Sequence, residues 1–181
     1  MKQINPLFLA GYFDCDGSFQ LQIGSRLSSS GKVNIRVNPR ATIAFMDGEK
    51  QREVLYAIQS TLRAGSIYFS NKDTAKAKIS WMTTNVEDCL KVAEYVLPFL
   101  WQKDRQARGF IKVCEIIRAG KLRRHGINLY GGEKIYSKEQ LIEMVTIATT
   151  LNVGIQNTKY RESQSRDTQH YLDIIEKIYP S

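Results

Sequence analysis

The chain has few cysteines, and their arrangement matches no structural framework. Only Cys15, Cys89 and Cys114 occur among the 181 residues, and they are far apart in the sequence. An odd, scattered set provides neither a disulfide framework nor the paired spacing of a zinc site. The composition therefore excludes a disulfide-rich secreted scaffold and favours a reducing compartment.

Long hydrophobic runs are also absent. No stretch approaches the roughly 20 apolar residues that a membrane-spanning helix needs. The apolar run near the start stops at Phe13 and is followed by acidic residues, not by the small residues of a signal-peptide cleavage site. We therefore expect an intracellular protein, in the cytoplasm of a prokaryote or inside an organelle, that is not secreted and has no membrane partner.

Acidic residues are outnumbered by basic ones. The chain carries 18 Asp and Glu against 26 Lys and Arg, a formal net charge of +8. Such a balance favours a polyanionic partner, with nucleic acid ahead of an anionic membrane surface, although a merely soluble basic protein has a similar composition. Hydrophobic residues make up 43%, which is enough for a core in one domain or one domain with a short appendage.

The hydrophobic periodicity predicts an α+β fold. Helical and alternating patterns follow one another in the order helix, strand, strand, helix, strand, strand, helix, helix. The expected ranges are helix 6–14, strands 18–26 and 32–45, helix 47–64, strands 66–71 and 75–82, and helices 84–97 and 104–118. A basic loop at 121–134 and helices at 137–151 and 168–179 follow. We expect residues 1–120 to form the core and 121–181 a helical extension packed on it.

The first predicted helix has no polar face. Asn5 followed by Pro6 is typical of a helix start, and the residues up to Phe13 are almost wholly apolar. A helix that is apolar all round is expected to be buried on all sides. Ala10 and Gly11 in its middle predict that another backbone approaches it closely, because an interior glycine otherwise costs about 1 kcal/mol.

The polar positions of the predicted strands suit nucleic-acid recognition. On the first two strands they contain no acid, unlike an ordinary solvated sheet face. Arg pairs with guanine and Asn or Gln with adenine in the major groove, while Lys and Arg neutralise phosphates. The predicted DNA-binding residues are Ser18, Gln20, Gln22, Arg26, Lys32, Asn34, Arg36, Asn38, Arg40, Thr42, Tyr68, Ser70, Lys72, Lys76, Lys78 and Ser80.

Two aspartates, Asp14 and Asp16, follow the first helix directly. Acids at a helix C-terminus face the negative end of the helix dipole, which is unfavourable unless a cation lies nearby. A calcium-binding loop does not fit, because Ser18 and Ser25 replace two of its acids. A solvated turn stays possible, but a bound divalent metal explains the placement better.

The stretch "LAGYFDCDG", Leu9 to Gly17, resembles the signature of the LAGLIDADG homing endonucleases. The predicted element order also matches the αββαββα core of that family, with antiparallel DNA-binding sheets, over about the first two-thirds of the chain. The resemblance implies a site-specific, metal-dependent DNA endonuclease. Because the chain has one motif, it implies a homodimer that cuts a long, near-palindromic target and needs no small-molecule cofactor.

The resemblance also implies roles for individual residues. Asp16 would bind the catalytic Mg²⁺, a site that Mn²⁺ or Ca²⁺ can also occupy, and Cys15 would lend a backbone carbonyl in place of the usual glycine. Asp47 would orient the attacking water or cap the second helix. Lys103 would act as a base or phosphate clamp. The implied dimer contacts are Leu7, Ala10, Gly11 and Asp14, of which Asp14 also supports the turn.

Several residue roles and the exact activity have alternatives. Either Lys50 or Arg52 would supply a second positive charge to the site. Lys121, Arg123 and Arg124 would add DNA contacts or simply belong to a segment that covers the core. Two other activities on the same fold are an intron-RNA maturase and a DNA-binding regulator. Both acids of the motif are present, which argues against the regulator.

Overall fold

A single antiparallel sheet runs through the computed structural model, which describes residues 3–27, 33–71, 74, 76–126, 136–151 and 168–179. The elements are α1 (Pro6–Cys15), β1 (Gly17–Leu27), β2 (Val33–Met46), α2 (Glu49–Leu62), β3 (Ser66–Ser70), β4 (Lys78–Thr83), α3 (Val86–Val96), the short 3₁₀ helix η1 (Leu97–Phe99), α4 (Asp104–Gly126), α5 (Lys138–Leu151) and α6 (Thr168–Ile178). The predicted α+β class and the αββαββα order are confirmed.

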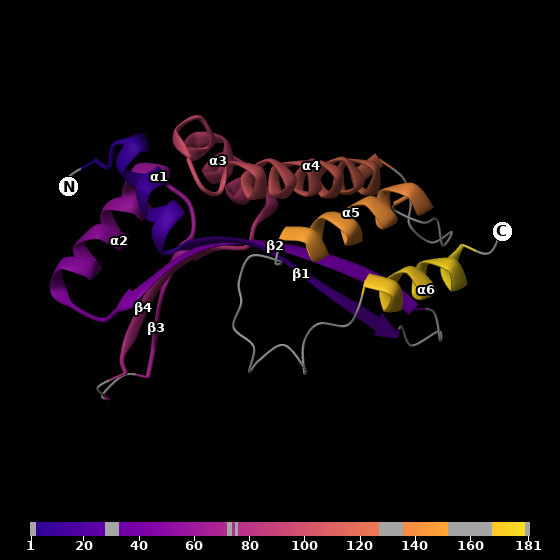
Figure 1. The fold of residues 1–181 in the computed structure, drawn as a ribbon, viewed down its shortest axis with the longest axis horizontal. Helices are drawn as coiled ribbons and strands as arrows, with labels where there is room; N and C mark the ends of the chain where they lie inside the picture. Colours follow the sequence, from indigo (N-terminus) through magenta and orange to yellow (C-terminus); the bar gives the residue numbers. More distant parts are fainter. Residues whose placement is uncertain are drawn as a thin grey trace.

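The strands lie in the order β1-β2-β4-β3, and every neighbouring pair is antiparallel. Helices α1, α3, α4 and α5 lie along one side of this sheet, and the other side is largely free of helices (Figure 1). The β3–β4 hairpin bends away from the long β1–β2 ribbon. One face of the sheet is therefore covered, and the alternation of the strands sends their apolar side chains toward it.

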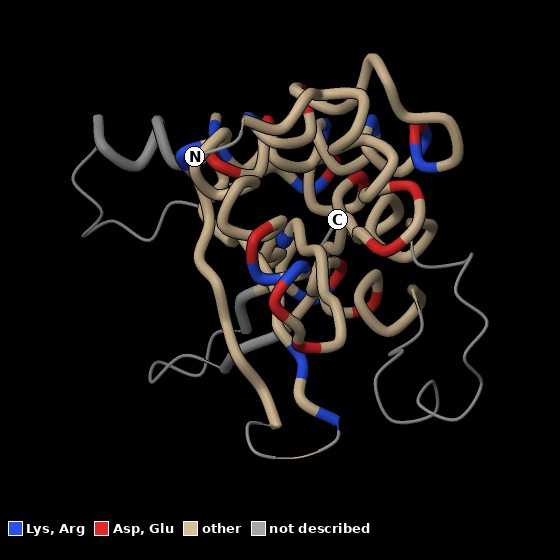
Figure 2. Tube along the Cα trace, turned by 90° about the vertical axis from the view of Figure 1, so that its left-hand side faces the viewer, with Lys and Arg blue, Asp and Glu red and all other residues tan. Residues whose placement is uncertain are grey.

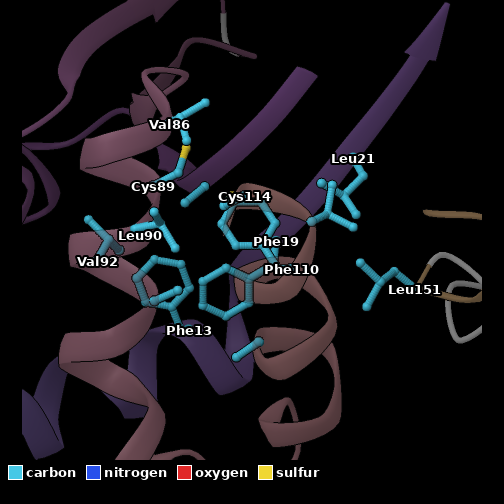
Figure 3. Packing of buried hydrophobic residues seen from close by; sticks show 14 of the residues in the cluster. Phe13, Phe19, Leu21, Val86, Cys89, Leu90, Val92, Phe110, Cys114 and Leu151 are labelled. Atoms are coloured by element: carbon cyan, nitrogen blue, oxygen red, sulfur yellow. The ribbon is translucent and has the colours of Figure 1, made fainter. Parts of the chain in front are cut away.

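Aromatic side chains join the first helix to the sheet. Phe13 stacks on Phe19 with ring centroids 4.7 Å apart, and Phe19 in turn contacts Phe110 of α4. Phe13 also meets Trp81 of β4 edge-on. Figure 3 shows the rings of Phe13, Phe19 and Phe110 among the buried side chains of α3 and α4. The core thus holds α1 against both the sheet and α4.

Only one face of α1 is buried by the chain itself. Leu9, Ala10 and Phe13 are fully covered, whereas Leu7 and Phe8 are 63% and 57% exposed. The expectation of a helix buried on all sides is therefore wrong for the single chain. The reason is geometric, because a helix lying on a sheet and two helices still turns one face outward.

Two predicted helix starts differ by one residue. The N-cap of α2 is Gly48, so Asp47 does not cap that helix. The N-cap of α3 is Asn85, whose side chain accepts from the N–H of Glu87, and not Thr84. At the start of α5, reciprocal hydrogen bonds between Ser137 and Gln140 form a capping box, in agreement with the predicted start at residue 137.

Helix α4 extends beyond its predicted end. It continues to Gly126 and does not stop near Arg118, so the segment with Lys121, Arg123 and Arg124 is helical where a loop was expected. The expected division at residue 120 therefore falls inside a helix. Helix α5 packs on α4 and β1, and α6 packs on α5 and β2. None of the helices in the described ranges is both long and apolar enough to cross a membrane.

We predict that Gly17→Ala destabilises the protein. A Cβ at this buried position would lie 2.6 Å from Cα of Phe13, so the end of α1 would have to move. Forced overpacking of this kind typically costs about 1–3 kcal/mol. Urea unfolding would measure the loss. Gly24→Ala is the matched control in the same strand, since a Cβ there meets nothing within 4 Å and the free energy of unfolding should not fall.

Candidate functional site

The C-terminal end of α1 is tied to the segment that begins α4. The Asp14 carboxylate accepts three backbone hydrogen bonds, from the N–H groups of Trp101 at 2.8 Å, Gln102 at 3.2 Å and Lys103 at 3.0 Å. These groups lie at the start of α4, where the helix dipole favours an anion. We call this set of contacts, together with those of the Lys103 side chain, the motif clasp.

The Lys103 side chain completes the motif clasp. Its Nζ donates to the carbonyl oxygens of Phe13 and Gly17, at 2.6 Å each. Partial burial lowers the pKa of this ammonium, and the negative groups of residues 14–16 partly oppose the shift. The Lys103 ammonium is therefore bonded to Gly17, the residue that follows Asp16. Lys103 lies 86 positions after Gly17 in the sequence, so only the fold brings them together.

Asp16 differs from Asp14 in having a free carboxylate. It forms the C-cap of α1 through its backbone N–H, which donates to Tyr12 at 2.8 Å. Its side chain is exposed and makes no hydrogen bond or ion pair with another residue of the described ranges. An unpaired anion at the negative end of a helix is unfavourable, so this position would attract a cation.

The donor set at Asp16 suits a hard cation. No group of three or more His, Cys, Asp or Glu side chains gathers for a metal anywhere in the described part of the chain. That excludes a closed all-protein cage there. Mg²⁺, however, commonly uses one or two carboxylates and completes its shell with water and phosphate oxygens. A free carboxylate such as that of Asp16 fits this requirement.

Asp47 forms an ion pair with Arg52. Its two carboxylate oxygens accept from Nε and Nη2 of Arg52, both at 2.7 Å. This ion pair holds the pKa of Asp47 below its usual value and raises the pKa of Arg52. The Arg52 guanidinium also lies 5.6 Å from the centroid of the Phe69 ring. Lys50, the other candidate for a second positive charge, is exposed on the first turn of α2.

These polar groups share one end of the β1–β2 ribbon. Gly17 pairs with Ile43 in the antiparallel register. Asp16 therefore precedes β1 at the end where Asp47 follows β2, and the Lys103 ammonium is bonded to the first residue of β1. The structure thus brings Asp16 and Lys103 together at the start of β1, whereas Asp47 comes after three further residues of β2 beyond Ile43.

The uncovered face of the sheet is polar and free of acids. The register aligns Gln20 with Arg40 and Gln22 with Asn38, and Arg40 donates to Gln22 at 3.4 Å. Further along, Tyr68 pairs with Ser80 and Ser70 with Lys78. Figure 2 shows the acidic residues on the helices and connecting segments; the charged residues of the four strands are all Lys or Arg.

The structure does not describe the side chains of all predicted DNA-binding residues. Lys32 and Lys72 lie outside the described residues, while Arg26, Asn34 and Arg36 are placed by strand register alone. The remaining predicted positions are on the strands of this face or, for Lys76, just before β4. Four further residues that were not predicted extend the alternation of Thr42, Ser80 and Tyr68 onto the same face: Ala44, Met46, Ser66 and Met82.

A groove runs between the exposed face of α1 and helix α2. It is lined on the α1 side by Leu7, Phe8, Gly11 and Cys15, with Asp16 just after the helix. On the α2 side the lining is mixed: Val54, Tyr56 and Ala57 are apolar or aromatic, and Glu53, Gln59 and Ser60 are polar. Ala10 does not contribute to it, because that residue is fully buried in the chain's own core. Of the four expected dimer contacts, Leu7 and Gly11 line this groove, whereas Asp14 belongs to the motif clasp.

The sequence of this region matches a known family. The family model for LAGLIDADG endonuclease matches residues 9–117, which is more than half of the chain and contains every element of the site. The chain belongs to the LAGLIDADG endonuclease family. No curated protein matches the chain in sequence.

Solved structures of LAGLIDADG enzymes share this fold. An archaeal intron-encoded homing endonuclease, I-Vdi141I, complexed with DNA, is 21% identical with a TM-score of 0.68, over 95% of this chain and 94% of that one. I-CvuI, in complex with its target in the presence of Ca, is 18% identical with a TM-score of 0.70, over 96% and 93%. The LAGLIDADG meganuclease I-CpaMI, bound to uncleaved DNA, is 24% identical with a TM-score of 0.63, over 95% of this chain but only 50% of its own.

We predict that Asp14→Asn loosens the LAGLIDADG motif from the start of α4. The amide has a single acceptor oxygen and no charge, so at least one of the three N–H groups loses its partner, which costs about 1–3 kcal/mol. Hydrogen exchange at residues 101–103 and urea unfolding would report the change. Asp104→Asn is the control, because it removes only a solvent-exposed i,i+4 ion pair with Arg108, which contributes little to stability.

Proposed function

We propose that this LAGLIDADG protein is a site-specific homing endonuclease that makes a double-strand break in a long, near-palindromic DNA target as a homodimer. The observation that carries the proposal is the free Asp16 carboxylate, with the Lys103 ammonium fixed beside it, at one end of an acid-free polar sheet face. Hydrolysis of a phosphodiester requires charge stabilisation at the phosphate, and the site provides both a metal-binding carboxylate and a cation.

The sheet face would bind duplex DNA. Gln20, Gln22, Asn38 and Arg40 present the side chains that read adenine and guanine edges in the major groove. Lys76 and Lys78 are exposed and would neutralise phosphates near the β3–β4 hairpin. The absence of acid on the strands supports this assignment, since a carboxylate there would repel the DNA backbone. The relatives described as DNA complexes, such as I-Vdi141I, are consistent with it.

Mg²⁺ is the proposed cofactor, and Asp16 with the backbone carbonyl of Cys15 would hold it. When bound, Mg²⁺ would polarise the scissile phosphate and lower the pKa of a coordinated water. Mn²⁺ could replace it, while Ca²⁺ shares the oxygen-donor preference with a different geometry. The exposed Cys15 thiol is not required for this role, because the carbonyl is the hard donor.

The protein side chains have separate roles in this proposal. Lys103 would stabilise the negative charge that accumulates on the phosphate, because its Nζ has already been partly desolvated. Asp47 stays ionised beside Arg52 and would accept a hydrogen bond from the attacking water, which orients it. We assign the second positive charge to Arg52 and not to Lys50, since Arg52 is the one that is held against Asp47.

The homodimer is supported by the exposed glycine on α1. A Cβ at Gly11 would meet nothing within 4 Å, and its φ is not in the left-handed region. Nothing within the chain therefore requires glycine there, yet glycine costs a helix interior about 1 kcal/mol relative to alanine. Close approach of a second α1 would explain the residue, because small side chains allow helix backbones to pack tightly. The 50% coverage of I-CpaMI agrees with a chain that corresponds to half of a two-motif enzyme.

We predict that Asp16→Asn abolishes cleavage while DNA binding survives. The amide keeps the size of the side chain but loses the charge that binds the metal. A duplex library enriched for insertion sites would be incubated with either protein, with Mg²⁺ or with EDTA, and the ends would be mapped. Staggered breaks at one near-palindromic sequence are expected only for the wild type with Mg²⁺. Cleavage by verified Asp16→Asn protein would contradict the assignment of the site.

The same experiment separates the other activities on this fold. Tight, salt-sensitive duplex binding without breaks by the wild type would indicate a DNA-binding regulator. Preferential binding to intron RNA, with no duplex binding, would indicate a maturase.

We predict that Gly11→Ala has opposite effects on the chain and on the dimer. Alanine should raise the helix stability of α1 by about 0.5–1 kcal/mol. It should also separate the two helices and raise the dimer dissociation constant at least about tenfold, which corresponds to 1.4 kcal/mol. Sedimentation equilibrium would measure the association. The control, Gly24→Ala, places a Cβ at another open glycine away from α1 and should leave the dimer unchanged.

A further inference from the structure

Trp101 is the most exposed large hydrophobic side chain in the described part of the chain. It is 91% exposed, and Phe99 two residues earlier is 44% exposed. The endonuclease site described above uses neither side chain. Exposed aromatic pairs of this kind on an ordered segment are typical of interface anchors, because Trp buries a large area with few rotatable bonds.

The backbone under Trp101 is held in place. Its N–H donates to the Asp14 carboxylate at 2.8 Å, as part of the motif clasp. Leu100, the residue between the two exposed aromatics, is half-buried and donates to the carbonyl of Leu97 at 3.3 Å. The indole is therefore presented to solvent from a fixed backbone, so little backbone entropy would be lost when a partner covers it.

Trp101 borders the exposed face of α1. Residues three and four apart on a helix lie on one stripe, so Leu7, Gly11 and Asp14 are aligned along α1. The segment 99–101 contacts this stripe through Asp14 and forms one edge of the exposed face. The groove with α2 forms the opposite edge, where Tyr56 is 48% exposed. Exposed apolar side chains thus lie at both edges of this face, and the groove between them also contains the polar residues Asp16, Glu53, Gln59 and Ser60.

We infer that Trp101 of each chain packs over the α1–α2 groove of a second copy, and so extends the homodimer interface beyond the α1 helices. This inference rests on the proposed function, in which both Asp16 residues face one DNA duplex. The two α1 helices must then point the same way, so the two-fold axis runs along them. Such an axis brings the 99–101 edge of one copy opposite the groove edge of the other.

Tryptophan fluorescence can detect this contact. The chain has two tryptophans, and Trp81 is fully buried with its Nε1–H donating to Ala64 at 2.9 Å. Trp101 therefore dominates any change in acrylamide quenching. Fluorescence would be measured over a dilution series without DNA and then with duplex DNA, in parallel with sedimentation equilibrium. Subtracting the fluorescence of a Trp101→Phe variant from that of the wild type would isolate the Trp101 signal.

We expect Trp101 to become protected from acrylamide, with blue-shifted emission, over the concentration range in which the dimer forms and before DNA is added. Trp101→Ala should raise the dimer dissociation constant at least about tenfold, whereas Trp101→Phe should retain most of the affinity. Met46→Ala is the matched control, because Met46 is 54% exposed on the polar sheet face and its loss should not affect association. Circular dichroism would verify that each variant is folded.

Two other results would overturn the inference in distinguishable ways. A dimer in which Trp101 stays quenchable until DNA is added would show that the indole contacts DNA, and the proposed endonuclease would still stand. A protein that stays monomeric at every concentration, with and without DNA, would remove the dimer itself and the proposed function with it.

Discussion

The motif clasp is the interaction on which the rest of the site depends. One carboxylate, that of Asp14, satisfies three N–H groups at the start of α4. One ammonium, that of Lys103, satisfies the carbonyls of Phe13 in α1 and of Gly17 at the start of β1. Each charged side chain thus compensates the dipole end of the other helix. The free carboxylate of Asp16 and the cation beside it are held at a fixed separation because both belong to this junction.

The two acids of the motif therefore have different physical roles despite their proximity in sequence. The Asp14 carboxylate accepts hydrogen bonds from three backbone N–H groups, whereas the Asp16 carboxylate accepts none from the described residues. Gly17 next to them is required by sterics, since Phe13 occupies the space that any Cβ would need. Phe13 in turn is fixed by stacking on Phe19. The position of the proposed metal ligand is thus determined by core packing on one side and by the motif clasp on the other.

The sheet face and the exposed face of α1 differ in charge and polarity. The strands carry no acid. Of the acids at their ends, Asp47 is paired with Arg52, whereas Asp16 is free. Most of the exposed large apolar side chains lie elsewhere, along α1, α2 and the 99–101 segment, and only Met46 and Tyr68 of the described set are on the sheet face. A polyanion and a second protein chain would therefore bind to different faces, which is what a dimeric DNA enzyme requires.

The sequence alone determined the elements and the polar sheet face, because alternation and capping are local properties that a few neighbouring residues decide. It also indicated Asp16 as the proposed metal ligand, since the motif from Leu9 to Gly17 is contiguous. The tertiary structure alone decided which face of α1 is buried, so that Ala10 points into the core and Gly11 outward. It also decided that Asp14 bonds to residues 101–103 and that Arg52, not Lys50, pairs with Asp47. The packing of α1 between the sheet and α4 brings Asp14 to residues 101–103, which are distant in sequence. The pair of Asp47 with Arg52 depends instead on a start of α2 shifted by one residue.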